Sequence, residues 1–259
     1  MTEPLQRAFA RKAFIPFITA GDPDLATTAA LVKAMAAAGA DLIELGIPFS
    51  DPIAEGPVIQ GADIRALAGG MTTDRLFAMI ADLRRDCDVP LALMTYINPV
   101  FVYGADRFMA CCREVGVCAV IVPDAPFEEK GELQASCTKY GVKQISMIAP
   151  TSEGRIAKIA AGAEGFIYVV SSLGVTGVRT NFSANLEDTV VAIRRYTKLP
   201  CAVGFGISTP EQAAHMAAFA DGAIVGSAIV KIIAAHGRDS VPYVSDYVKQ
   251  MRAALDKVQ

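Results

Sequence analysis

The 259-residue sequence predicts an α/β fold, a (β/α)8 TIM barrel that forms a single domain over residues 1–259. Three observations lead to this prediction. Alanine-rich helical stretches repeatedly end at glycine or another small residue, and a short β-branched run follows almost at once. Eight such runs occur, with a helical pattern between each pair. The runs are almost continuously apolar, which is typical of parallel strands that are buried on both faces.

Taken in order, the runs predict strands at Ala13–Thr19, Asp41–Leu45, Leu91–Tyr96, Ala119–Val122, Gln144–Ile148, Gly165–Val170, Cys201–Phe205 and Ala223–Val225. An open, doubly wound sheet is the structural alternative. The absence of a GxGxxG motif after the first strand and the count of eight strands both weigh against it.

Composition narrows the range of functions. A net charge of −3 gives no basic field to attract nucleic acid or an anionic membrane. Charged residues interrupt every apolar stretch before it could cross a bilayer, and the first residues lack the apolar run of a secretory signal, so we expect a cytoplasmic protein. The six cysteines form no CxxC pair and have no histidine at metal-ligand spacing, which predicts reduced packing thiols and no metal site.

Two expected connections are longer than a simple βα turn, at Gly46–Val58 and Ser171–Ser183. Long connections in a compact domain are usually either functional lids or disordered segments. Because each follows a strand, we expect both on the face of the barrel where active sites form.

Ionisable residues near the predicted strand ends are Glu44, Asp124, Asp51 and Glu55. Glu44 interrupts an apolar strand, where an uncompensated charge is costly and a carboxyl group often has a raised pKa suited to proton transfer. The alternative is a structural carboxylate held by backbone amides or an internal arginine. Both histidines of the sequence fall in expected helices, so we expect carboxylates to carry the protons.

Glycine-containing segments after the last two strands predict a phosphate site, at Gly204-Phe205-Gly206 and Gly226-Ser227-Ala228. In barrels, backbone N–H groups from such loops and a helix N-terminus converge on the anion, and Ser227 is placed to cap the following helix. Val175-Thr176-Gly177 is a third candidate, as part of a lid. Glycines also simply form turns, which is the alternative for each segment.

The chain resembles the tryptophan synthase α family over nearly its whole length. The matching segments follow the family's order: FIPFITAGDP (residues 14–23), ELGIPFSDP (44–52), GPVIQ (56–60), PDAP (123–126), GVTG (174–177), GFGIS (204–208) and GSAIVK (226–231).

The resemblance implies a role for individual residues. It makes Glu44 the general acid–base, places Glu55 where the family usually has an aspartate, and puts Tyr168 beside the catalytic carboxylate. The implied phosphate ligands are Gly177, Gly206, Gly226 and Ser227. The implied indole pocket, whose residues could otherwise be general barrel core, consists of Phe17, Ile59, Met94, Ile121, Ile148, Thr176 and Phe205.

The implied reaction is a carbon–carbon lyase step of tryptophan biosynthesis, the retro-aldol cleavage of indole-3-glycerol phosphate to indole and glyceraldehyde 3-phosphate. Glu44 would serve both proton transfers. Glu55 would accept the indole N1–H hydrogen bond and stabilise the charge that develops on the ring.

The family also implies a β subunit as partner, in an α2β2 complex, which receives the indole. Pyridoxal phosphate is expected on that partner and no cofactor on this chain, because nothing in the sequence marks a Schiff-base lysine. The expected contacts are Pro48–Val58 and Asn98-Pro99-Val100.

Two other functions stay open at this point. One is another phosphate-binding barrel, an isomerase or epimerase, because many barrels share these phosphate elements. The other is a weakly active subunit that mainly regulates its partner, in which Glu55 marks lost catalysis.

Overall fold

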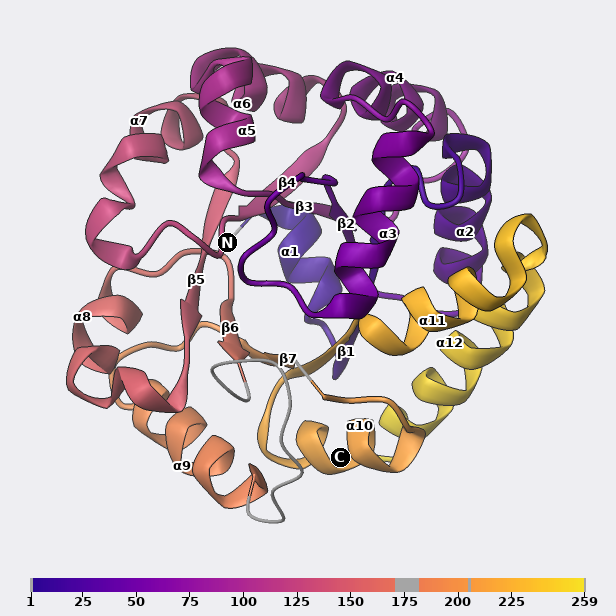
Figure 1. Cartoon of the computed structure of the whole chain (residues 1–259). Coiled ribbons are helices and arrows are strands. Elements are labelled where there is room, and N and C mark those ends of the chain that lie inside the picture. Colours follow the sequence, from indigo (N-terminus) through magenta and orange to yellow (C-terminus); the bar gives the residue numbers. More distant parts are fainter. Residues whose placement is uncertain (1, 171–181, 205, 259) are drawn as a thin grey trace.

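The computed structural model describes residues 2–170, 182–204 and 206–258. Eight parallel strands close into a barrel in sequence order, and helices surround them (Figure 1). The predicted fold class is confirmed, and each predicted strand end lies within two residues of the observed one. The strands are β1 (Ala13–Thr19), β2 (Ile43–Gly46), β3 (Leu91–Met94), β4 (Val117–Ile121), β5 (Lys143–Ile148), β6 (Ile167–Val170), β7 (Cys201–Gly204) and β8 (Gly222–Val225).

Helices connect consecutive strands, with two helices after β2 and another two after β3. Side chains that accept backbone N–H groups cap several helices, for example Asp24 at α2 and Thr209 at α10. The helices are α1 (Glu3–Ala8), α2 (Leu25–Ala37), α3 (Pro57–Ala68), α4 (Thr73–Leu83), α5 (Ile97–Tyr103), α6 (Ala105–Glu114), α7 (Gly131–Tyr140), α8 (Ile156–Ala161), α9 (Phe182–Arg194), α10 (Pro210–Phe219), α11 (Ser227–His236) and α12 (Val241–Leu255).

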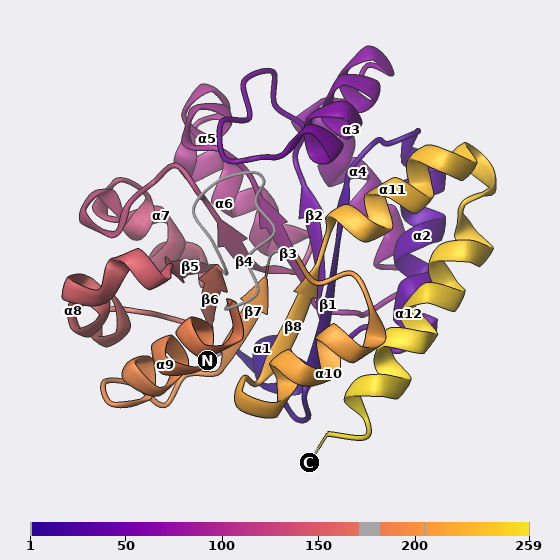
Figure 2. The same ribbon diagram turned by 60° about the horizontal axis from the view of Figure 1, so that its bottom comes forward.

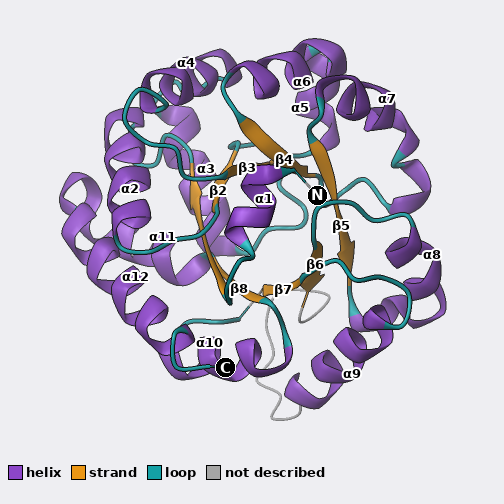
Figure 3. Ribbon diagram, turned by 180° about the vertical axis from the view of Figure 1, so that it is seen from behind, coloured by secondary structure: helices purple, strands orange, loops and turns teal. Residues whose placement is uncertain are grey.

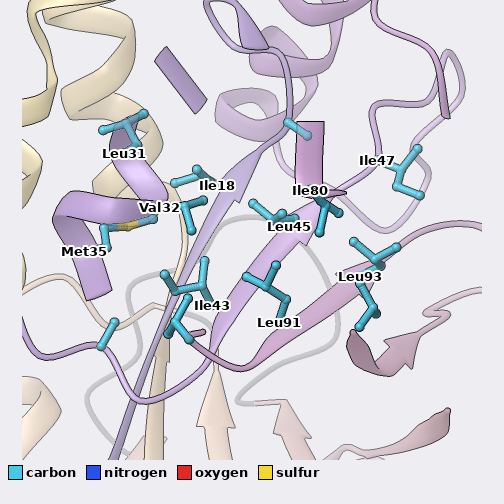
Figure 4. Packing of buried hydrophobic residues seen from close by; sticks show 14 of the residues in the cluster. Ile18, Leu31, Val32, Met35, Ile43, Leu45, Ile47, Ile80, Leu91 and Leu93 are labelled. Atoms are coloured by element: carbon cyan, nitrogen blue, oxygen red, sulfur yellow. The ribbon is translucent and has the colours of Figure 1, made fainter. Parts of the chain in front are cut away.

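The sheet separates two apolar layers. Alternate residues of a strand point to opposite faces. On β2, Ile43 and Leu45 point outward and pack with helix residues such as Leu31 (Figure 4). Leu42 belongs to the second layer, inside the barrel. By the same alternation Glu44 faces the interior.

Helix α1 lies across the end of the barrel where the strands begin, as the view from behind shows (Figure 3). Its residues Leu5 and Ala8 are buried among the interior residues. The opposite end, where the strands finish, carries the long loop between β2 and α3, with α3 and α5 beside it (Figure 2).

An ion cluster fastens the last helix to the start of the second strand. Arg252 of α12 is buried, and its Nη1 lies 2.7 Å from Asp41 Oδ2 and 2.8 Å from the carbonyl oxygen of Lys12. Asp41 also accepts from Arg11 Nε at 2.9 Å and from the backbone N–H of Phe14 at 2.8 Å. The cluster lies at the strand-start end of the barrel, where residues contribute to stability rather than to catalysis.

All six cysteines are unpaired, and four of them are buried, as expected for packing thiols. Over the part of the chain that the structure describes, no helix combines the length and the apolar character needed to cross a bilayer.

Candidate active site

Glu44 occupies the interior of the barrel near the carboxyl end of β2. Its side chain has no exposed surface, and within the described structure neither carboxyl oxygen has a hydrogen-bond partner. Burial, and then the charge of Glu55, raise its pKa from 4.5 to about 8. The alternative of a carboxylate held by backbone amides or an arginine has no counterpart among the described contacts. A carboxyl group in this state can donate a proton near neutral pH and take one back.

Glu55 lies in the loop between β2 and α3 and is half-buried. Burial, and then the charge of Asp63, raise its pKa to about 7. Two hydrogen bonds hold the loop backbone at Ala54 and at Glu55. The backbone N–H of Ala54 donates to Tyr96 Oη at 2.9 Å, and the side-chain amide of Gln60 donates to the Glu55 carbonyl oxygen at 2.9 Å.

Tyr168 enters the site from β6 and is buried. Burial, and then the charges of Glu44 and Glu55, hold the pKa of its hydroxyl well above the usual value, so the three groups share one site. Gly204 on the neighbouring strand β7 makes room for the ring. A Cβ atom at this glycine would lie 2.5 Å from Tyr168 Oη.

Four of the residues expected in the indole pocket belong to the interior apolar cluster that contains Tyr168: Phe17, Ile59, Met94 and Ile121. The structure therefore places them in the barrel interior, in the same packed cluster as Tyr168. Thr176 and Phe205, also expected there, lie outside the described residues.

The expectation for Ile148 needs correction. Its side chain packs in the outer layer, in one cluster with Ile156 and Ile159 of α8. Its neighbour Met147 packs against the interior cluster instead. Because successive strand residues point to opposite faces, a shift of one position moved the prediction to the wrong side of the sheet.

Three of the predicted phosphate residues, Gly206, Gly226 and Ser227, follow the ends of the neighbouring strands β7 and β8. Gly206 has a φ of 79°, which favours glycine, and Gly226 is the N-cap of α11. Ser227 is the first residue of α11 rather than its N-cap, which is Gly226. The prediction that Ser227 caps the helix is therefore wrong, although its backbone N–H lies in the anion-binding first turn. Gly177 lies outside the described residues.

Two further residues have structural roles that the sequence did not reveal. Asp124 accepts the backbone N–H of Ile97 at 3.0 Å and so caps α5. Val100, expected at a partner contact, is fully buried, whereas its neighbours Phe101 and Val102 are exposed.

The sequence reasoning also missed a second acidic group beside the site. Asp63 on α3 is buried, and Asp22 forms a two-point ion pair with Arg65, with both N–O distances at 2.8 Å. The signal was visible, because Asp63 falls on the apolar stripe that also contains Ile59 and Ala66. No group of three or more histidine, cysteine or acidic side chains in the described ranges is arranged to hold a metal ion.

Comparison with known proteins decides the family. The family model for the tryptophan synthase alpha chain matches residues 5–257. The chain belongs to the tryptophan synthase alpha chain family. The alpha chain of Lacticaseibacillus casei is 49% identical to it over 245 residues, which are 95% of this chain and 92% of that one.

Solved structures agree with this assignment. The tryptophan synthase alpha subunit of Legionella pneumophila has a TM-score of 0.89 at 35% identity, and the match covers 100% of both chains. A chain of the tryptophan synthase complex of Pyrococcus furiosus has a TM-score of 0.84 at 34% identity, with 93% of this chain and 98% of that one covered. As a member of the tryptophan synthase alpha family, this chain is a lyase that cleaves indole-3-glycerol phosphate.

Proposed function

We propose that this alpha chain performs the retro-aldol cleavage with Glu44 as its acid–base and Glu55 as the group that stabilises the charged indole ring. The observation that carries the proposal is the buried Glu44 carboxyl, which lies beside Glu55 and Tyr168 and has no partner of its own among the described residues.

The two proton transfers follow from the state of Glu44. The protonated carboxyl donates to indole C3, which makes that carbon tetrahedral and places a positive charge on the ring. The hydroxyl of the adjoining glycerol carbon then loses its proton to the Glu44 carboxylate, and the bond to C3 breaks. The bond's electron pair returns to the ring, so indole leaves, the new aldehyde belongs to glyceraldehyde 3-phosphate, and Glu44 is protonated again.

Glu55 must be ionised to accept the indole N1–H while the ring is positive. Its pKa of about 7 and that of Glu44, about 8, then predict a narrow bell-shaped rate profile. The acid limb reports ionisation of Glu55, and the alkaline limb reports loss of the proton from Glu44. The phosphate binds in this proposal to the backbone N–H groups of Gly206, Gly226 and Ser227, together with Gly177, which follows β6 in the sequence.

Replacing the acid–base tests the central assignment. Glu44→Gln should slow indole release by roughly 100-fold or more, because one residue supplies both transfers. Glu114→Gln, at an exposed position on α6, is the matched control and should retain wild-type turnover. Near-normal turnover in Glu44→Gln would remove it from the mechanism.

Two substitutions test the charge and the length of the Glu55 side chain separately. Glu55→Gln should impair turnover because an amide lacks the negative charge, whereas Glu55→Asp should remain active because it keeps the carboxylate. Full activity in Glu55→Gln would show that the indole charge is stabilised elsewhere. Turnover by the isolated chain also tests the weakly active, partner-regulating alternative.

We further propose that this chain forms a 2:2 complex with a β subunit in the cytoplasm. The β subunit docks at the strand-end face and receives the indole there. It carries pyridoxal phosphate, and no cofactor is proposed on this chain. Large apolar side chains are exposed on this face: Ile53 is 83% exposed in the β2–α3 loop, and Val102 is 81% exposed on α5. Exposed apolar patches commonly mark protein interfaces.

Binding of a tryptophan synthase β chain tests this surface. Val102→Asp should weaken the association at least tenfold, because it buries a charge at an apolar contact. Val191→Asp is the matched control, since Val191 is exposed on α9, across the barrel from α5 (Figure 1). Equal affinities of the two variants would exclude this face, and sedimentation of the wild-type complex measures its stoichiometry.

A further inference from the structure

Asp22 and Arg65 form an ion pair that the proposed mechanism does not use. Arg65 Nε donates to Asp22 Oδ1, and Arg65 Nη2 donates to Asp22 Oδ2, each at 2.8 Å. The Asp22 side chain is 1% exposed, and in the described part of the chain its carboxylate has no partner besides Arg65. Two parallel hydrogen bonds fix the orientation of both groups, and a buried carboxylate that loses its arginine is strongly destabilised.

The pair joins two segments that are far apart in the sequence. Asp22 lies in the loop between β1 and α2, whereas Arg65 lies on α3. The same loop touches the chain just after α3, because a Cβ atom at Gly21 would lie 3.1 Å from the Met71 side chain. Helix α3 also packs against β1 and lies beside α11 (Figure 1). The loop after β1 therefore holds the C-terminal half of α3.

The other end of α3 contacts the candidate active site. The side-chain amide of Gln60, in the first turn, donates to the Glu55 carbonyl oxygen at 2.9 Å. Ile59 is 6% exposed and belongs to the interior cluster that contains Tyr168. Because α3 is one continuous helix, a displacement at Arg65 also displaces Ile59 and Gln60.

We propose that Arg65 is a positioning residue, which through its pair with Asp22 holds α3 and thereby keeps Glu55 in its working position. This proposal rests on the role proposed for Glu55. The guanidinium group of Arg65 is bound to Asp22, so Arg65 acts through the helix and does not contact the reacting atoms.

Three substitutions test the pair. Arg65→Met removes both hydrogen bonds but keeps most of the apolar stem. Arg65→Lys keeps the positive charge, but an ammonium group does not reproduce the two parallel bonds of a guanidinium group. Arg252→Met is the matched control, because Arg252 also binds an aspartate with little exposure, Asp41, at the opposite end of the barrel.

Hydrogen exchange tests the position of α3 without any dependence on catalysis. The backbone N–H groups of Glu55 and Gln60 each donate to a backbone carbonyl oxygen at 3.0 Å. In Arg65→Met both amides should exchange about tenfold faster than in wild type, while those of β2 change less than about twofold. In Arg252→Met the ratio between the two sets should keep its wild-type value. Unchanged exchange in Arg65→Met, or equal acceleration in β2, would overturn the proposal.

A double-mutant cycle shows whether the effect passes through Asp22. Asp22→Ala should accelerate exchange at Glu55 and Gln60 about as much as Arg65→Met does, and the double variant should exceed either single variant by less than about twofold. Multiplying effects would mean that Arg65 acts without Asp22 and would overturn the proposal. If Arg65→Met or Asp22→Ala does not fold, Arg65→Lys and Asp22→Asn replace them in the cycle, with smaller accelerations expected.

Steady-state kinetics tests the consequence. In Arg65→Met, kcat per folded chain should fall about tenfold, because a small misplacement of Glu55 weakens its contact with the charged ring. KM should stay within about threefold, since the proposed phosphate contacts belong to the ends of β7 and β8 and not to α3. Arg65→Lys should recover part of kcat, and Arg252→Met should keep both constants.

The kinetic outcomes separate this proposal from the proposed function. A rise in KM at unchanged kcat in Arg65→Met would overturn the proposal, because α3 would then shape binding and not the position of Glu55. Full activity in Glu55→Gln would refute the role of Glu55 instead. The exchange rates would still decide whether Arg65 holds α3.

Discussion

Exchange of Glu44 for glutamine should change how the stability of the protein depends on pH. The pKa of this carboxyl is raised from 4.5 to about 8 on folding, chiefly by burial. A carboxyl group of this kind stabilises the folded chain fully below pH 4.5, where both states are protonated, and the contribution is lost as pH rises toward 8. Between these values the unfolded chain releases the proton and the folded chain keeps it.

The size of the effect follows from this difference. Each pH unit in the interval costs the wild-type chain up to about 1.4 kcal/mol, so the free energy of unfolding should fall by roughly 2 kcal/mol between pH 5.5 and 7.5 because of Glu44 alone. Glutamine has nearly the same shape and does not ionise. In Glu44→Gln this part of the pH dependence is absent, while the contributions of Glu55 and Asp63 are present in both proteins.

Thermal unfolding at several pH values measures the effect. At roughly 2–4 °C for each kcal/mol in a chain of this length, the melting temperature of Glu44→Gln relative to wild type should rise by about 4–8 °C from pH 5.5 to 7.5. Glu114→Gln, with its exposed side chain, should follow the wild-type curve. If the curves of Glu44→Gln and wild type run parallel, the raised pKa and the acid–base assignment built on it are refuted.

Two more substitutions separate the catalytic end of the barrel from the stabilising end. Gly204→Ala places a Cβ atom 2.5 Å from Tyr168 Oη, so we expect a loss of about 1–3 kcal/mol of stability and a lower kcat, measured by melting and by indole release. Wild-type values for both would show that the ring moves aside freely. Arg252→Met leaves the buried carboxylate of Asp41 with one arginine instead of two, and should cost about 2 kcal/mol in urea unfolding at unchanged kcat. A specific loss of kcat in the folded variant would contradict the division between the two ends.

Sequence reasoning succeeded where a regular period governs the structure. The eight strands follow from apolar runs between helical stretches, and their burial on both faces makes the count reliable. Glu44 could be selected as well, because a charge in an apolar strand breaks the pattern visibly. Its lack of any partner among the described residues, which separates a proton carrier from a structural carboxylate, required coordinates.

The errors arise where a shift of one position along the chain changes the direction or the role of a side chain. Ile148 and Met147 are both apolar, so composition does not distinguish them, and only the register of β5 assigns Met147 to the interior. The prediction for Ser227 is wrong for a similar reason. Helix α11 begins at Ser227, one residue earlier than predicted, so this residue lies in the first turn and not at the N-cap. Asp63 was overlooked although its position was informative, because it falls on the same buried stripe of α3 as Ile59 and Ala66.

The fit between Gly204 and Tyr168 also limits how this sequence can drift. The residues come from neighbouring strands, where Gly204 pairs with Val170, two positions beyond Tyr168, so the constraint runs diagonally across one strand pair. A lineage that acquires a larger residue at position 204 first is left with a clash in its active site. The ring on β6 must shrink before β7 can change, so the order of the two substitutions determines which descendants remain functional.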